Sequence, residues 1–132
     1  MLRTTDGIAF RDLNKNGRLD TYEDSRRPIE ERVADLLSQM TLEEKAGLMF
    51  HTFVPVNPDD TTLAGPGMFG APSVAELLVD RRMSHFNLPW IPSPRQTAEW
   101  YNRLQRLAAG TGLGIPVTIA SDPRHVHLEP EP

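Results

Sequence analysis

The most regular hydrophobic pattern of the chain lies between Pro28 and Met40. Apolar residues recur there at steps of four, three, one and three from Ile29, which places them on one face of a helix. Pro28 suits a first helical position, because its missing N–H would have no partner there. Glu30 and Glu31 follow in the first turn, where the positive end of the helix dipole favours carboxylates. We therefore predict an amphipathic helix from Pro28 to about Met40.

Starting signals predict three further helices. In a capping box, a Ser or Thr and a Glu or Gln three residues later satisfy each other's free backbone N–H groups. Apolar residues at helical spacing follow each such pair, and Gly110 ends the last helix. The pairs are Thr41 with Glu44, Ser73 with Glu76, and Ser93 with Gln96. The predicted helices span about 41–49, 73–82 and 93–110.

Two short segments have the character of strands. The run from Ile115 to Ala120 is apolar and rich in β-branched residues, which favours a buried parallel strand. A second strand is expected at about 83–87. Residues 51–72 contain several Pro and Gly residues without periodicity, so we expect a long surface loop there. The order helix, strand, helix, strand predicts a helix-rich α/β fold.

Composition narrows the class of protein. The 132 residues, 39% of them hydrophobic, are enough for the core of one domain. A net charge of −4 gives no concentrated positive field, so no nucleic-acid partner is expected. No apolar run has the length of a membrane span, and the first ten residues lack the apolar stretch of a secretory signal, so no membrane contact is expected. With no cysteine, disulfides and thiolate metal sites are excluded.

Residues 12–23, with the sequence DLNKNGRLDTYE, have the spacing of a calcium-binding EF-hand loop. Oxygen-bearing side chains stand at positions one, three, five, nine and twelve, and Gly17 stands at position six, where such loops turn sharply. We predict a structural Ca²⁺ that ties the amino terminus to the body of the domain. The predicted ligands are the side chains of Asp12, Asn14, Asn16, Asp20 (directly or through a water) and Glu23, with the backbone carbonyl of Arg18.

Other interpretations of this loop stay open. A surface turn rich in Asn, Asp and Gly that binds no ion would have the same composition. A paired calcium sensor is disfavoured, because the sequence contains one such loop and the first predicted helix begins at Pro28 rather than directly after Glu23. A small calcium-dependent binding module of the dockerin type is the alternative function, although it would require a second, similar loop.

Two segments carry a family resemblance. The first is PIEERVADLLSQMTLEEKAGLM at residues 28–49, and the second is GIPVTIASDPRH at residues 114–125. Both resemble family 3 glycoside hydrolases, the β-glucosidase and exo-glucanase group. The second is similar to the family's segment in which a barrel strand ends in an aspartate, followed three residues later by a histidine. With the helices between them and the calcium-type loop ahead of them, the resemblance covers nearly all of residues 10–127.

The resemblance implies that the chain holds the opening segment of a (β/α)8 TIM barrel, preceded by the EF-hand-like loop. Residues 1–27 would form an amino-terminal segment, 28–127 part of the barrel domain, and 128–132 a frayed tail. The family consists of retaining enzymes that hydrolyse O-glycosyl bonds at non-reducing ends, using two carboxyl groups roughly 5 to 5.5 Å apart. The family's nucleophile and acid/base residue lie further along the chain. We therefore expect a fragment of a β-glucosidase-like enzyme that is inactive alone.

The resemblance also assigns the substrate-binding residues. Asp122 would accept hydrogen bonds from hydroxyls of the terminal sugar of a β-glucoside, whereas a turn or helix-cap role is the alternative for an Asp before Pro. Arg124 and His125 would line the same subsite or be solvated. His125 and His127 form a His-x-His pair, but no third ligand lies close in sequence, so zinc is not expected. After His125 the sequence departs from the family pattern.

Three further expectations concern surroundings and packing. Two strands cannot close a barrel, and open apolar strand edges tend to associate, so we expect the fragment to self-associate. Calcium loops of modest affinity fill more readily outside the cytosol, which favours an exported parent protein, periplasmic or extracellular. Trp90 and Trp100 could stack on sugars, although Trp100 lies on the apolar face of its predicted helix and is expected in the core.

Overall fold

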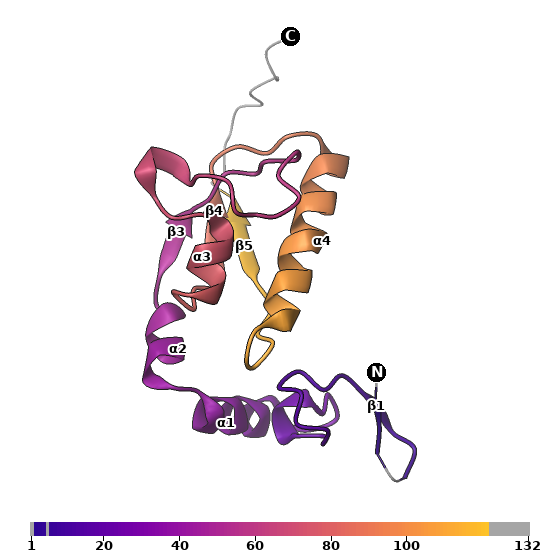
Figure 1. The fold of residues 1–132 in the computed structure, drawn as a ribbon. Helices are drawn as coiled ribbons and strands as arrows, with labels where there is room; N and C mark the ends of the chain where they lie inside the picture. The colour runs from indigo at the N-terminus through magenta and orange to yellow at the C-terminus, as the bar shows by residue number, and fades with distance from the viewer. Residues whose placement is uncertain (1, 5, 122–132) are drawn as a thin grey trace.

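The computed structural model of the chain describes residues 2–4 and 6–121. Figure 1 shows a lower arm, which contains the amino-terminal segment and helix α1, and an upper body, which contains a small sheet with its helices. In chain order the elements are β1 (Leu2–Arg3), β2 (Ala9–Phe10), the 3-10 turn η1 (Thr21–Glu23), α1 (Ile29–Gln39), α2 (Leu42–Gly47), β3 (His51–Phe53), the 3-10 turn η2 (Met68–Gly70), α3 (Val74–Val79), β4 (His85–Leu88), α4 (Pro94–Gly110) and β5 (Thr118–Ser121).

The body is built on a parallel sheet of three strands in the order β3-β4-β5. Helix α3 connects β3 to β4, and α4 connects β4 to β5. Both helices pack on the same face of the sheet, and they contact each other (Figure 1). This arrangement confirms the predicted α/β class. None of the helices in the described part of the chain is long and apolar enough to cross a membrane.

The hydrophobic core lies between this sheet face and the two helices. Phe86 and Leu88 of β4 point into it, because alternate side chains of a strand face the same side. Trp100, Leu104 and Ala108 of α4 lie on one helical face at steps of four, and each is at most 1% exposed. The expectation that Trp100 belongs to the core is therefore confirmed.

Strand β3 corrects one expectation. Residues 51–72 were expected to form one long loop, but His51–Phe53 pairs with β4, His51 opposite His85 and Phe53 opposite Asn87. The three residues have no alternating or apolar pattern, and Phe53 is 48% exposed, so the sequence carried no strand signal. The other two strands were expected near their observed positions. Pairing of β5 begins only at Thr118, two residues after Pro116, which has no N–H to donate.

The lower arm ends in the predicted amphipathic helix α1, which packs against η1. The helix begins at Ile29 after Pro28, close to the expected start. A reciprocal capping box then opens α2, as predicted: the Thr41 hydroxyl accepts the Glu44 N–H at 3.1 Å, and the Glu44 carboxylate accepts the Thr41 N–H at 2.9 Å. Helix α2 therefore leads directly from the arm to the body.

Gly47, the last residue of α2, permits a close backbone contact with the body. A Cβ atom at this position would lie 2.3 Å from the carbonyl oxygen of Arg82 and 2.6 Å from its carbonyl carbon. These are backbone atoms of the turn before β4, so a rotamer change cannot relieve the clash. The absence of a side chain at Gly47 lets α2 lie against that turn.

We expect Gly47→Ala to lower the free energy of unfolding by about 1–3 kcal/mol, the usual cost of overpacking a close contact. Urea denaturation followed by circular dichroism would measure the loss. Gly110→Ala is the matched control, because Gly110 is also the last residue of a helix and a Cβ there meets nothing within 4 Å. This control is expected to be neutral or stabilising by about 0.4–1 kcal/mol. Equal stability of the two variants would contradict the assigned contact.

Candidate functional site

The carboxyl edge of the parallel sheet is the first candidate site. Strand β5 runs parallel to β4 with Ser121 opposite Leu88, so the chain leaves β5 at the same edge at which it leaves β4. In sheets of parallel strands, ligands and catalytic groups gather at this edge. Asp122 follows Ser121 directly in sequence, but Asp122, Arg124, His125 and His127 lie outside the described residues.

Exposed aromatic and apolar side chains follow the strands at this edge. Trp90 and Ile91, in the loop after β4, are 61% and 56% exposed, and Phe69, in η2 after β3, is 96% exposed. Trp90 and Trp100 therefore have different environments, because Trp100 is buried among the core residues. Of the two aromatic residues considered from the sequence, Trp90 has a side chain free to contact a ligand.

The loop at residues 12–23 is the second candidate site. Gly17 has a φ of 79°, the left-handed conformation expected for the sharp turn. The Asp12 carboxylate accepts the backbone N–H groups of Asn16 at 3.0 Å and Gly17 at 2.9 Å. The side-chain amides of Asn14 and Asn16 both donate to one oxygen of Asp20, at 2.7 and 2.6 Å. The predicted ligand side chains at positions one, three, five and nine therefore belong to one hydrogen-bonded turn.

Glu23 closes this loop. Its carboxylate accepts the backbone N–H of Leu13 with one oxygen and that of Asp20 with the other, the latter at 3.1 Å. The second and last positions of the loop, Leu13 and Glu23, are thereby held together. Arg18 is exposed, and its backbone N–H donates to the Asn16 side chain at 2.8 Å. Its charged side chain need not face the other predicted ligands.

Several hydrogen bonds fix this loop to α1 and to the body. Asn14 donates to Gln39 at 3.1 Å, and the backbone N–H of Tyr22 donates to Asp35 at 2.9 Å. On the side of the body, Lys15 donates to the carbonyl of Thr111 at 2.7 Å, and the Tyr22 hydroxyl donates to the carbonyl of Leu113 at 3.3 Å. The loop therefore bridges the arm and the body.

The electrostatics of the loop are acidic. Burial, followed by the charges of Glu23, Asp20 and Asp12, raises the pKa of Tyr22 far above its usual range. Burial and neighbouring carboxylates both disfavour the charged phenolate, so the Tyr22 hydroxyl keeps its proton. Within the described residues, however, no three His, Asp or Glu side chains lie close enough together to hold a metal ion. The amide groups of Asn14 and Asn16, rather than a second carboxylate, face Asp20.

An open cavity of about 640 Å³ lies between the arm and α4. Its size is within the range of small-molecule sites. Two polar side chains on its walls are bonded within the protein: Gln105 donates to the carbonyl of Val117 at 2.7 Å and accepts its N–H at 3.1 Å, and Arg32 donates to the carbonyl of Tyr22 at 3.1 Å. These bonds indicate a structural role for Gln105 and Arg32.

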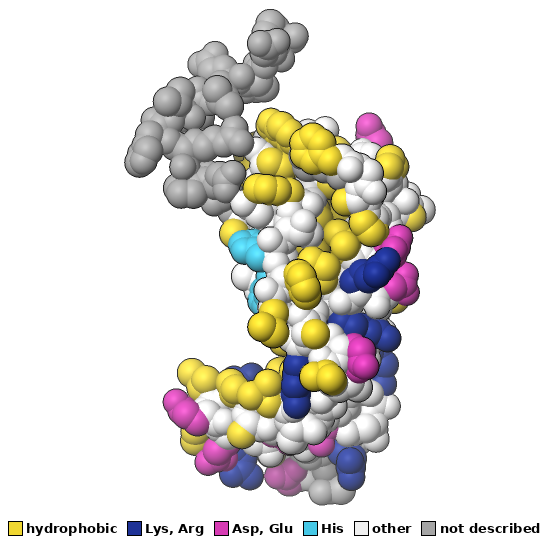
Figure 2. Space-filling model, turned by 90° about the vertical axis from the view of Figure 1, so that its left-hand side faces the viewer, with side chains coloured by type: hydrophobic (Ala, Val, Ile, Leu, Met, Phe, Trp, Pro, Cys, Tyr) yellow, Lys and Arg dark blue, Asp and Glu magenta, His cyan; other side chains and the backbone are white. Residues whose placement is uncertain are grey.

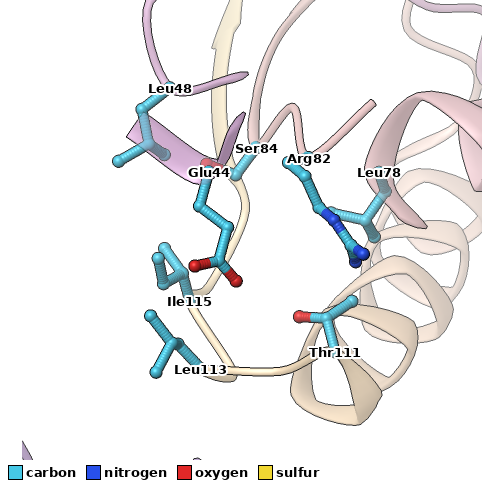
Figure 3. Close-up of a pocket in the computed structure, with 8 residues that line it drawn as sticks. All are labelled: Glu44, Leu48, Leu78, Arg82, Ser84, Thr111, Leu113 and Ile115. Carbon is cyan, nitrogen blue, oxygen red and sulfur yellow. The ribbon is translucent and has the colours of Figure 1, made fainter. Parts of the chain in front are cut away.

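A second, much smaller cavity of about 30 Å³ lies below the amino ends of β4 and β5. Figure 3 shows the carboxylate of Glu44 and the guanidinium of Arg82 pointing into it, with Thr111 beside them. The hydroxyl of Ser84 is buried there without a hydrogen-bond partner among the described residues. The volume suffices for about two water molecules and excludes a sugar ring. Isolated polar residues such as Ser84 carry no spacing signal, so the sequence could not indicate this cavity.

Comparison with known proteins finds relatives that share a name. No protein-family model matches the chain. The chain is 44% identical over 124 residues, 93% of its length, to the periplasmic beta-glucosidase/beta-xylosidase of Dickeya chrysanthemi. It is 44% identical over 116 residues to the probable beta-glucosidase C of Aspergillus oryzae, and 41% identical over 128 residues to the beta-glucosidase C of Emericella nidulans. The predicted resemblance to β-glucosidases is confirmed.

The chain is thus similar to part of several proteins named beta-glucosidases. It spans about 19% of the length of the Dickeya relative and 18% and 20% of the two fungal relatives.

Proposed function

We propose that this chain is the amino-terminal part of a retaining β-glycosidase, similar to a β-glucosidase, that hydrolyses O-glycosyl bonds at non-reducing ends. The observation that carries the proposal is the identity of 41–46% to relatives named beta-glucosidases over 82–93% of the chain. The substrate class is a β-glucoside. The family resemblance implies that the nucleophile and acid/base carboxylates lie outside residues 1–132, so we propose that these residues alone do not cleave the bond.

The architecture of the body supports an opening segment of a (β/α)8 barrel. Its three strands are parallel, they lie side by side in sequence order, and both connecting helices pack on one face. Repetition of this unit would curl the sheet around the face that carries no helix. In a barrel of this kind, working residues stand at the carboxyl ends of strands, the edge at which β5 ends.

Asp122 is proposed to bind the terminal sugar. It follows Ser121 in sequence, and Ser121 is the last residue of β5 and pairs with Leu88 at the carboxyl edge of the sheet. A carboxylate can accept two hydroxyl hydrogen bonds from a sugar, and such charge-assisted bonds are strong and directional. Arg124 and His125 are proposed to line the same subsite.

A chimera provides the test, in which the 132 residues replace the matching segment of the Dickeya relative. We expect the chimera to hydrolyse an aryl β-glucoside and the 132-residue chain alone to show no turnover. Asp122→Asn in the chimera should lower kcat/KM about ten- to a hundredfold, because a hydrogen bond to a charged group contributes about 1.5–3 kcal/mol.

Asp80→Asn is the control for this experiment, because Asp80 is an exposed carboxylate at the end of α3, before β4 and away from the carboxyl edge. Its kcat/KM should equal that of the unmodified chimera. A folded chimera without β-glucosidase activity would argue against the proposed function. Full activity of Asp122→Asn would argue against the role of that carboxylate alone.

We further propose that the loop at residues 12–23 binds a structural Ca²⁺. Its donor set consists of oxygens of the kind that Ca²⁺ prefers, and Gly17 adopts the turn that such loops need. Rotation of the Asn14 and Asn16 amides would exchange the N–H groups that face Asp20 for carbonyl oxygens. An ion bound there would offset the negative charge around Tyr22, and a location outside the cytosol would supply the calcium.

Calorimetric titration of the metal-free chain with CaCl₂ would test the loop. We expect saturable heat and a higher unfolding temperature, since a ligand that binds the folded state alone stabilises it. Glu23→Gln should weaken binding at least about tenfold, because it removes a carboxylate that supplies two oxygens. Asp24→Asn should bind normally, because Asp24 is paired with Arg26 at 2.7 Å and holds no ligand position. Absence of heat and of any thermal shift at millimolar Ca²⁺ would eliminate the site.

A further inference from the structure

The apolar stripe of α1 has no partner in the described part of the chain. Ile29, Val33 and Leu37 follow one another at steps of four along one helical face and are 69%, 49% and 45% exposed. No residue of α1 is buried. A stripe of this width normally faces a core, because exposed apolar area is unfavourable in water. We therefore expect another apolar surface to pack against this face of α1.

The face of the sheet that carries no helix is also uncovered. Register places His51 and Phe53 of β3 beside His85 and Asn87 of β4 on this face, and each of these side chains is half-buried or exposed. Figure 2 shows the histidines at the side of a hollow whose lower wall is the arm, with hydrophobic side chains along the wall. Parallel sheets are normally covered on both faces.

We propose that this hollow, formed by the α1 stripe and the open face of the sheet, is the docking surface for the remainder of a β-glucosidase chain. The inference rests on the proposed function. The chain spans about a fifth of its relatives, so the polypeptide that corresponds to the other four-fifths is a partner large enough to cover this surface. Strands β3 and β5, at the two edges of the sheet, offer backbone groups for further strands.

A second copy of the chain fits this surface less well. A twofold contact places the same patch of both copies face to face, and it therefore requires a self-complementary surface. Two hollows that face each other would leave a space between them. The occupant must instead be convex and must carry apolar side chains toward α1. Self-association through the open strand edges would not cover the stripe.

The test uses the Dickeya relative without the segment that matches this chain, co-expressed with the 132-residue chain. We expect a one-to-one complex in size-exclusion chromatography with light scattering. Val33→Glu and Leu37→Glu should each weaken the complex at least about tenfold, because a carboxylate would be buried against apolar groups. Ala34→Glu adds the same charge to an exposed position of the same helix, one residue off the stripe, and should leave the complex unchanged.

Thermal unfolding of each variant alone provides a check on folding, since Val33 and Leu37 are already about half exposed and their replacement should not unfold the chain. Unaltered complex formation by Val33→Glu and Leu37→Glu would overturn the proposal. The proposal would also be overturned if the unmodified chain formed no complex, or if it formed a homodimer that Val33→Glu abolishes. A complex that lacks β-glucosidase activity would count against the proposed function but not against the docking surface. An active covalent chimera whose separate parts form no complex would count against the docking surface but not against the proposed function.

Discussion

The packing of α4 against the central strand β4 is the interaction on which the body depends. Trp100 and Leu104, each at most 1% exposed, lie in one core with Phe86, which is fully buried. Burying two aromatic side chains and a leucine contributes several kcal/mol, about 1.5–3 kcal/mol for each fully buried side chain. Because α4 must return the chain to the start of β5, this packing also forces β5 to run parallel to β4. The carboxyl edge is a consequence of that core.

Local signals allowed the helices to be predicted. The Thr41 capping box and the four-residue spacing of Trp100, Leu104 and Ala108 are encoded within a few neighbouring residues, and each was found where the sequence indicated it. The strand at His51–Phe53 was missed, because its stability comes from pairing with residues more than thirty positions away. Periodicity also identified the apolar face of α1, but a pattern within one helix cannot tell what covers that face.

The two candidate sites also differ in how far local sequence patterns could predict them. The spacing of Asp12 and Glu23 within one loop is local, so the residues that the turn brings together could be predicted from the sequence. The site at the carboxyl edge was predicted from a family resemblance at Asp122. The residue pattern alone would not have distinguished a sugar-binding Asp122 from a turn residue. Trp90 and Trp100 were both candidates for sugar stacking from the sequence, and only their exposure in the structure separated the free side chain of Trp90 from the buried one of Trp100.

The loop and the docking surface are mechanically connected. Asn14 and Tyr22 bond to residues of α1, while Lys15 bonds to the carbonyl of Thr111 just after α4, so the loop helps to set the angle between the arm and the body. That angle determines how the stripe of α1 faces the open sheet. Anything that stiffens the loop would therefore preorganise the hollow and reduce the ordering that docking requires. A structural ion in this loop would act on assembly rather than on the chemistry of bond cleavage.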